Sequence, residues 1–404
     1  MSENLTPIKR YDRLFIGFLS LLFVGIVYAW SILNGPLRAE FGWTPAQLAL
    51  CFTITMCFFC VGGIFAGNVV KKLKPKLTVI LAGVLVLVGM ILTSMNPGSL
   101  ILLYITYGVI TGTGVGMSYN IMIASTNAWF PDRRGFSTGT LMMGFGISAM
   151  VLGNIARAMF EMEGVGWRTT FVILGIAIGG VLLLAGLLVR LPGPDVKFPT
   201  PKANTKRPPV QAEELKPTEM VKRPFYWQMY ISNSLMTGVG FSVISFAMAF
   251  SLSVGAEPAF AALLVGALSI GNALGRIFCG LTYDAFGSRI TLLVAFLLNA
   301  GSAALLFVTV STGALPLLVI GIITTGIGFG FCPTISGAFT MEYFGKTNFP
   351  ANFGISTTLL IPGSILATVS GIVYQTFHSY QHVFVMLFAI CIVSLILIMT
   401  MKKK

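Results

Sequence analysis

The sequence predicts an all-α membrane protein, with twelve transmembrane helices arranged in two pseudo-symmetric six-helix bundles. Only 10% of the 404 residues are charged, against about 25% in a typical soluble protein. Hydrophobic residues make up 55% of the chain, and the mean hydropathy is +0.87. Twelve spans of roughly 20 residues fit this length. The apolar segments are continuous rather than alternating, which excludes a transmembrane β-barrel.

Twelve apolar segments are each long enough to cross the bilayer. We expect helices at residues 14–35, 45–70, 77–95, 99–127, 136–158, 168–190, 226–251, 258–282, 288–311, 315–340, 349–374 and 381–401. Residues 191–223 contain seven prolines and seven Lys or Arg residues, so this segment is predicted to be a cytoplasmic linker. The predicted domains are therefore an N-terminal bundle at 1–190, the linker at 191–223 and a C-terminal bundle at 224–404.

Positive charges are distributed unevenly along the chain. Of the 26 Lys and Arg residues, 22 lie in the termini, the linker and the loops on one side of the predicted topology. Only Arg38, Arg157 and Arg168 fall near the opposite side. This asymmetry follows the positive-inside rule, so we expect a multi-pass protein of the plasma membrane or cell inner membrane with both termini cytoplasmic. It argues against nucleic-acid binding, and we expect a monomer whose surroundings are the lipid bilayer.

The two halves of the chain resemble each other. Gly114-Val115-Gly116 in the fourth helix matches Gly328-Phe329-Gly330 in the tenth at an offset of 214 residues. Phe130 matches Phe344 at the same offset, and Gly67 matches Gly280 at an offset of 213. Parallel repeats of this kind are typical of two-bundle transporters, which bind substrate near the membrane midplane between the bundles.

The distribution of polar residues separates the candidate function classes. The six cysteines lie in apolar segments without metal-ligand spacing, so we expect no metal and no cofactor. A membrane enzyme would need a nucleophile or an acid–base pair, a channel would need a filter, and a cation or drug carrier would place a carboxylate in its cavity. None of these features is present. His378 and His382 fall in a short external loop, where we expect solvated side chains.

One charged residue lies well inside an apolar span. Placing Arg276 in hydrocarbon costs at least roughly 2.5–3.5 kcal/mol, and Asp284 is eight residues further on, about 12 Å along the helix axis. A bound anion would explain such a guanidinium, and its planar fork suits a carboxylate. Ser269 and Asn272 share its helical face. Snorkelling to the cytoplasmic surface and a fixed interhelical pair are the alternatives.

Aromatic and amide side chains on polar stripes complete the candidate substrate site. Tyr28 lies on the polar stripe of the first helix, and Tyr119 and Asn120 follow the glycine pair of the fourth. Tyrosine offers an apolar wall and a hydroxyl donor, which suits a small organic anion. Phe145 and Phe331 are further candidates for the wall. Ordinary helix packing is the alternative for each of these residues.

A second set of candidates lies at the cytoplasmic helix ends. Residues 280–289 form a GxxxDxxGxR pattern that contains Asp284 and Arg289. The carboxylate would pair with a nearby arginine or a helix N-terminus and hold a cytoplasmic gate shut, whereas a solvated loop is the alternative. The equivalent place after the fourth helix holds Asp132, Arg133 and Arg134.

These motifs together resemble a known family. Twelve helices in two halves, a long linker and GxxxDxxGxR resemble the major facilitator superfamily. Within it, residues 28–31 (YAWS), 129–135 (WFPDRRG), 166–168 (GWR) and 272–276 (NALGR) are similar to the oxalate/formate antiporter family, which is related to the monocarboxylate transporters. The resemblance spans essentially the whole chain. It implies uptake or exchange of small carboxylates by alternating access, with the carboxylate bound by the helix-eight arginine that Arg276 matches.

Two departures from the family pattern refine this expectation. The oxalate exchanger of that family carries a lysine in helix eleven, whereas residues 349–374 contain no Lys or Arg. One cation balances one carboxylate, so a monoanion such as lactate, pyruvate or formate fits better than oxalate. Animal monocarboxylate transporters place an Asp where this chain has Asn272, which cannot titrate. We expect a monocarboxylate transporter, with proton symport as the leading mechanism and anion exchange as the alternative.

Overall fold

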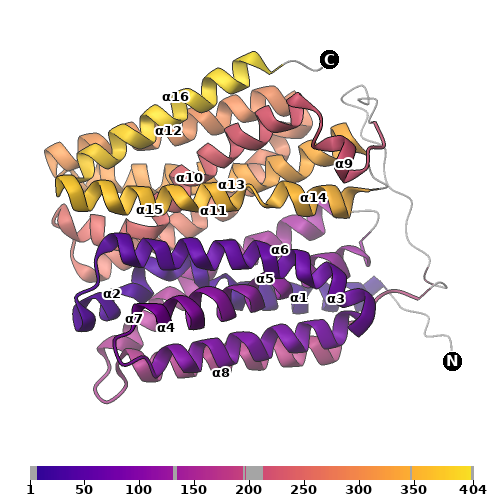
Figure 1. The fold of residues 1–404 in the computed structure, drawn as a ribbon, viewed down its shortest axis with the longest axis horizontal. Coiled ribbons are helices and arrows are strands. Elements are labelled where there is room, and N and C mark those ends of the chain that lie inside the picture. The colour runs from indigo at the N-terminus through magenta and orange to yellow at the C-terminus, as the bar shows by residue number, and fades with distance from the viewer. Residues whose placement is uncertain (1–6, 131–133, 194–195, 197–212, 346–347, 402–404) are drawn as a thin grey trace. The chain divides into compact units, whose positions relative to one another are not determined.

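The computed structural model describes residues 7–130, 134–193, 196, 213–345 and 348–401, which are helical with short connections and contain no strand (Figure 1). Twelve helices within these residues are long and apolar enough to span a membrane, which confirms the predicted class. The spans are Arg10–Phe41, Pro45–Ala66, Leu73–Ser94, Leu100–Asn127, Ser137–Glu161, Gly166–Leu188, Pro224–Ser253, Pro258–Tyr283, Ser288–Thr312, Leu315–Phe344, Ala351–Phe377 and Tyr380–Thr400.

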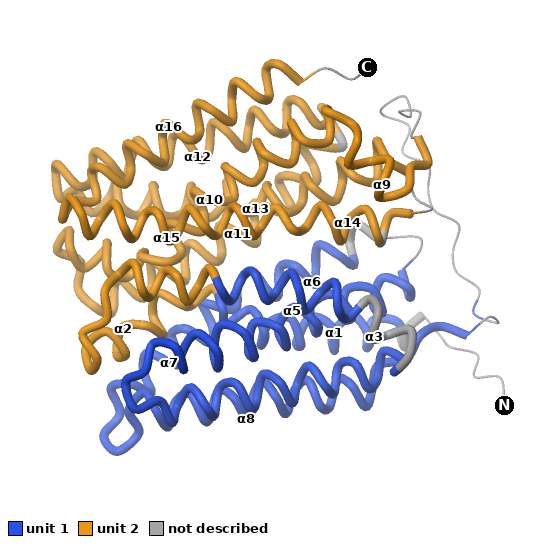
Figure 2. Tube along the Cα trace, in the orientation of Figure 1, with its two compact units in different colours: residues 1–27, 54–205 blue, residues 28–53, 206–404 orange. Residues whose placement is uncertain are grey.

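The chain forms two compact units, coloured separately in Figure 2. Unit 1 comprises residues 1–27 and 54–205. Its elements are α1 (Pro7–Val24), most of α3 (Pro45–Ser94), α4 (Leu100–Leu103), η2 (Tyr104–Thr111), α5 (Gly112–Asn127), α6 (Arg134–Ser148), η3 (Ala149–Gly153), α7 (Asn154–Glu161) and α8 (Gly166–Leu188). The long α3 joins two of the predicted spans across a kink at Lys74, whose φ of 62° breaks the helix just before Pro75.

Unit 2 comprises residues 28–53 and 206–404. Its elements are α2 (Trp30–Phe41), the start of α3, α9 (Pro217–Met220), α10 (Pro224–Ser253), α11 (Pro258–Phe286), α12 (Ser288–Thr312), α13 (Leu315–Phe344), α14 (Phe349–Thr357), α15 (Leu360–Phe377) and α16 (Tyr380–Thr400). Residues 28–53 thus pack with the C-terminal half of the chain, although they belong to the first two predicted helices. The predicted domain boundaries follow the sequence repeat and remain a prediction.

Four of the described spans are not regular α-helices, and one of them, the eleventh, is divided into α14 and α15. The first changes to a 3₁₀ helix at η1 (Gly25–Ala29), and the fourth and fifth contain the π-helical segments η2 and η3. At the first break, a Cβ on Gly25 would lie 2.6 Å from the Ser148 Cβ and would overlap the Phe145 carbonyl, so only glycine allows this approach. Such irregular turns occur often at functional sites.

The predicted internal repeat corresponds to equivalent helix packing in the two units. In unit 1, Gly114 packs against the Ala82 carbonyl and Gly116 against the Phe59 carbonyl, both on α3. In unit 2, Gly328 packs against the Asn299 side chain on α12, and Gly330 packs against the Asn272 carbonyl on α11. The paired glycines therefore bring helix four against helices two and three, and helix ten against helices eight and nine.

The last part of the predicted linker packs on unit 2. The backbone N–H groups of Glu213 and Leu215 donate to the carbonyls of Tyr343 and Phe344, each at 3.3 Å. The Asn352 Nδ2 in α14 donates to the Leu215 carbonyl at 3.0 Å. Residues 213–223, which include α9, therefore hold the ends of α13 and α14 together.

Candidate functional site

Arg276 is buried inside the eighth span. Its side chain lies about two turns from the end of Pro258–Tyr283 and is only 4% exposed. The Nε donates to the Asn272 Oδ1 at 3.3 Å, but the Nη1 is buried and has no hydrogen-bond partner among the described residues. No ion pair with an acid joins it in that part of the chain. Because a buried donor without an acceptor is costly, and a charged one more so, this guanidinium is suited to binding an anion.

Asn272 presents a second free donor beside the guanidinium. It is 1% exposed, and its Nδ2 is buried without a partner in the described chain. Because its Oδ1 accepts the bond from Arg276, the amide is oriented with its donor group away from that bond. Ser269, on the same face of α11, is also buried. The predicted face of α11 thus carries two unsatisfied donors and a hydroxyl.

Glycines on both sides of the α11–α13 contact fix the position of Arg276. Gly271 and Gly275 on α11 face Gly326 and Gly330 on α13. A Cβ on Gly271 would lie 2.6 Å from the Ile323 carbonyl oxygen, and a Cβ on Gly330 would lie 3.0 Å from the Arg276 backbone nitrogen. These small-xxx-small pairs allow direct backbone contact, so α13 sets the height of Arg276 in the bundle.

The equivalent position in unit 1 carries no charge. The offset of 213 residues that relates Gly67 to Gly280 also relates Gly63 to Arg276. The Asn120 amide packs against Gly63 and donates to the Gly116 carbonyl at 3.1 Å. Asn120 therefore fills the space opposite a glycine and has a packing role in unit 1, while its place in a substrate site remains a prediction.

Tyr28 lies in the 3₁₀ turn of the first span and packs against two aromatic residues of unit 2. Its ring centroid is 5.6 Å from that of Phe329 on α13 and 6.4 Å from that of Phe241 on α10. Phe241 and Phe329 are in turn 5.1 Å apart. The sequence singled out Tyr28 but missed the two phenylalanines, although Phe329 lies between the two repeat glycines.

The other predicted aromatic residues are buried. In unit 1, Tyr119 on α5 and Phe145 on α6 have ring centroids 5.1 Å apart, and Phe59 on α3 is 5.1 Å from Tyr119. Phe331 on α13 is 1% exposed, and its carbonyl accepts a weak bond from the Cys279 thiol of α11 at 3.5 Å. The structure thus brings together Tyr119 and Phe145, with Phe59 as an additional member.

The GxxxDxxGxR segment contacts α13 and α16. Arg289 donates to the Met399 carbonyl in the last turn of α16 at 3.2 Å. A positive charge is favourable there because the helix dipole makes the C-terminal end of a helix partly negative. Tyr283 donates its hydroxyl to the Glu342 carboxylate at the end of α13, and Ser288 and Tyr343 hydroxyls are 3.0 Å apart. The remaining predicted gating groups lie outside the described residues or side chains: Asp132, Arg133, Arg134 and Asp284.

Residues 28–53 contact α15 closely within unit 2. The Thr53 hydroxyl donates to the Ser364 carbonyl at 2.6 Å and lies 2.8 Å from the Thr368 hydroxyl. Near the far end of α15, a Cβ on Gly371 would lie 2.9 Å from the Ala46 Cα. The start of α3 therefore lies backbone to backbone against α15.

Twelve membrane-spanning helices in two repeats, with a buried arginine in the eighth, are typical of a membrane transporter. The chain belongs to the Major Facilitator Superfamily, whose sequence profile matches residues 14–253 and 231–404. Its family and fold are those of transporters rather than enzymes.

Comparisons with individual proteins agree with this family. The chain is 24% identical to the oxalate:formate antiporter of Oxalobacter formigenes over 82% of its length and 76% of the relative's. It is also 24% identical to mouse monocarboxylate transporter 2, over 84% and 73% of the two lengths. The fold matches the Escherichia coli xylose transporter XylE with a TM-score of 0.71 at 12% identity, covering 98% of this chain and 99% of that one.

Proposed function

We propose that this protein carries small monocarboxylates, such as lactate or pyruvate, across the membrane by alternating access. The observation that supports this most is the buried Arg276 guanidinium, whose Nη1 has no partner among the described residues. A carboxylate can accept two parallel hydrogen bonds from such a fork. The resemblance to an oxalate:formate antiporter and to monocarboxylate transporters favours the same class of substrate.

The charge of the site favours a monoanion over a dianion. The eleventh span, which α14 and α15 form, contains no Lys or Arg. A second carboxylate would therefore lack a cation there, and an uncompensated charge is expensive where the effective dielectric is low. Uptake of labelled lactate should saturate and should be stimulated by unlabelled lactate or pyruvate on the opposite side, whereas oxalate should compete weakly.

The bound anion also explains how the carrier would close. Arg276 without a ligand resists being sealed away from water, because a buried charge loses its hydration. A carboxylate neutralises the guanidinium and lowers the cost of the occluded state, so substrate shifts the population toward it. A carrier requires that substrate binding favour the occluded state in this way, whereas a channel does not.

Proton symport and anion exchange differ in what drives the substrate. We propose symport, in which one carboxylate and one proton enter together. In proteoliposomes, an inward proton gradient should drive lactate accumulation in empty vesicles. The exchange alternative predicts no accumulation unless the vesicles are preloaded with a carboxylate. The exchange alternative is supported by the resemblance of the chain to the oxalate:formate antiporter.

Replacing Asn272 with Asp should place an acid next to the substrate-binding arginine. The Asn272 Oδ1 already accepts from the Arg276 Nε at 3.3 Å, so a carboxylate at that position would compete with the substrate. We expect Asn272→Asp to bind lactate about tenfold more weakly at neutral pH and to recover at acidic pH, when the new acid is protonated. Equal affinity of wild type and variant at neutral pH would contradict the proposed site. The readout is equilibrium binding of labelled lactate.

The contact between residues 28–53 and α15 is proposed to part and reform during transport. Gly371→Leu should prevent it from closing, because even a Cβ would lie 2.9 Å from the Ala46 Cα. We expect lactate transport to fall about tenfold or more, with a smaller loss of lactate binding. Gly354→Leu, at a position with open space on α14, is the matched control. Unchanged transport by Gly371→Leu would show that this contact is not a gate.

A further inference from the structure

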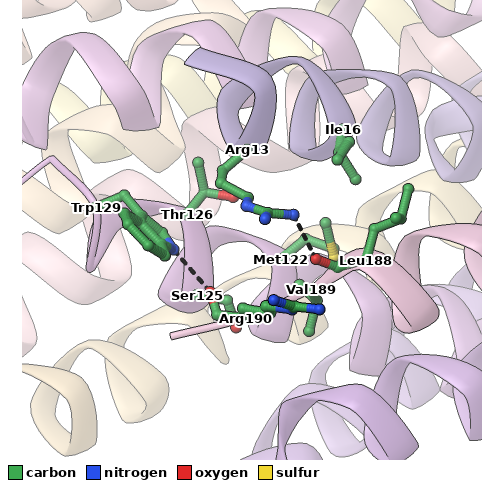
Figure 3. Close-up of a pocket in the computed structure, with 9 residues that line it drawn as sticks. All are labelled: Arg13, Ile16, Met122, Ser125, Thr126, Trp129, Leu188, Val189 and Arg190. Atoms are coloured by element: carbon green, nitrogen blue, oxygen red, sulfur yellow. Dashed lines mark hydrogen bonds between the residues drawn. The ribbon is translucent and has the colours of Figure 1, made fainter. Parts of the chain in front are cut away.

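A small pocket lies inside unit 1, where α1, the end of α5 and the end of α8 come together (Figure 3). The lining residues are Arg13, Ile16, Met122, Ser125, Thr126, Trp129, Leu188, Val189 and Arg190. Its empty volume is about 210 Å³, part of which is open to solvent. This space is therefore accessible from the protein surface.

Among the residues that the structure describes, the lining of the pocket contains two arginines and no acid. Arg13 donates one Nη1 bond to the Leu188 carbonyl at 2.6 Å, while its Nε is buried and has no partner among the described residues. Trp129 donates its indole N–H to the Arg190 carbonyl at 2.7 Å and so holds the backbone of the second arginine beside the first. Two guanidinium groups without a carboxylate between them favour an anionic ligand.

The position of the pocket points to the membrane surface. Three spans have ends there: Arg10–Phe41 begins just before Arg13, Leu100–Asn127 ends just before Trp129, and Gly166–Leu188 ends at the pocket itself. The edge of the hydrocarbon core is where lipid headgroups lie. Phe15 and Leu187, next to the lining residues Ile16 and Leu188, are exposed apolar side chains suited to contact acyl chains.

We propose that this pocket binds the phosphate group of an anionic phospholipid. Arg13 and Arg190 donate to the phosphate oxygens, and the acyl chains lie along the apolar side chains beside them. Basic pockets at the ends of membrane helices are known to suit such headgroups. Arg10, one turn before Arg13, adds positive charge to the same end, and its guanidinium lies 5.0 Å from the Phe130 ring centroid. The lipid would bridge α1 to the end of α8, independently of the transported substrate.

Thermal unfolding of the purified full-length protein in neutral detergent tests this site. A ligand that binds the folded state but not the unfolded chain raises the unfolding midpoint, and the rise grows with the ligand concentration relative to its Kd. We expect palmitoyl-oleoyl phosphatidylglycerol to raise the midpoint more than the matched phosphatidylcholine does, and inorganic phosphate to have no comparable effect. Arg190→Gln should weaken the apparent phosphatidylglycerol affinity about tenfold. Arg13→Gln combined with Arg190→Gln should remove the difference between the two lipids.

The control removes two exposed charges from the same unit without touching the pocket. Lys74→Gln combined with Lys76→Gln should retain the phosphatidylglycerol preference, since neither residue lines the pocket. Arg190→Gln keeps the backbone bond from Trp129 and the Arg13 bond to Leu188, so it should fold even if the double variant does not. If the lysine control loses as much of the phosphatidylglycerol preference as the arginine variants do, general attraction between the lipid and the charged surface explains the effect, and the proposed site is overturned. Stabilisation by inorganic phosphate equal to that by phosphatidylglycerol would overturn the assignment to lipid, and an unchanged lipid preference in Arg190→Gln would overturn the site itself.

Discussion

Replacing Arg276 with Gln is expected to abolish counterflow of labelled lactate in proteoliposomes. The glutamine keeps much of the volume but loses the charge and the planar fork. Each hydrogen bond to a charged group contributes about 1.5–3 kcal/mol, so losing a bidentate pair should weaken carboxylate binding by roughly 100-fold or more. Counterflow is the suitable readout because it requires substrate binding and reorientation but no net proton movement.

Arg276→Lys tests whether the positive charge alone is sufficient, or whether the planar guanidinium is also needed. Lysine keeps one positive charge and offers a point-like ammonium, so we expect residual counterflow with weaker affinity. Lys222→Gln, which removes an exposed positive charge from the end of the linker, should behave like wild type. Counterflow near the wild-type level in Arg276→Gln would remove this residue from the proposed role.

A single methyl group at Gly330 is expected to destabilise the protein and weaken the site together. Its Cβ would overlap the Asn272 carbonyl and lie 3.0 Å from the Arg276 nitrogen, so α11 and α13 would have to separate. Overpacking of this kind costs about 1–3 kcal/mol, which should lower the unfolding midpoint by about 1–4 °C in a chain of this length. Lactate affinity should also fall, because Arg276 would move with α11.

Gly301→Ala provides the same chemical change where space is available. Gly301 lies within α12, and a Cβ there would meet nothing within 4 Å. This variant should keep the unfolding midpoint and lactate affinity of the wild type or slightly raise the midpoint, since alanine favours helix. If Gly330→Ala also keeps both properties, the α11–α13 contact does not set the position of Arg276.

The sequence predicted the helices well because apolar length alone defines a span. All twelve predicted segments correspond to spans in the structure. The breaks within them were not predicted. The 3₁₀ turn at Gly25–Ala29 depends on close approach to Phe145, and the π-helical Tyr104–Thr111 looks like ordinary apolar helix in the sequence. These are tertiary effects that periodicity does not encode.

The candidate site was predictable in part. Arg276 stood out because a charge is rare inside an apolar span, and its neighbour Asn272 followed from helical spacing. Phe59, Phe241 and Phe329 were missed, since phenylalanine occurs 32 times and carries no distinguishing signal. The repeat could have identified Phe59, which the 213-residue offset relates to Asn272. The pairing of Arg289 with the end of α16 could not be foreseen, because it joins helices distant in the sequence.

The most direct measurement of the central claim is a thermal-shift comparison of a carboxylate ligand with its neutral amide. Lactate and lactamide have nearly the same shape, but only lactate carries a carboxylate. The proposed role of Arg276 predicts that lactate raises the unfolding midpoint of the wild-type protein, that lactamide does not, and that Arg276→Gln loses the response to lactate. An equal response to lactate in wild type and Arg276→Gln, or an equal response to both ligands in wild type, would contradict it.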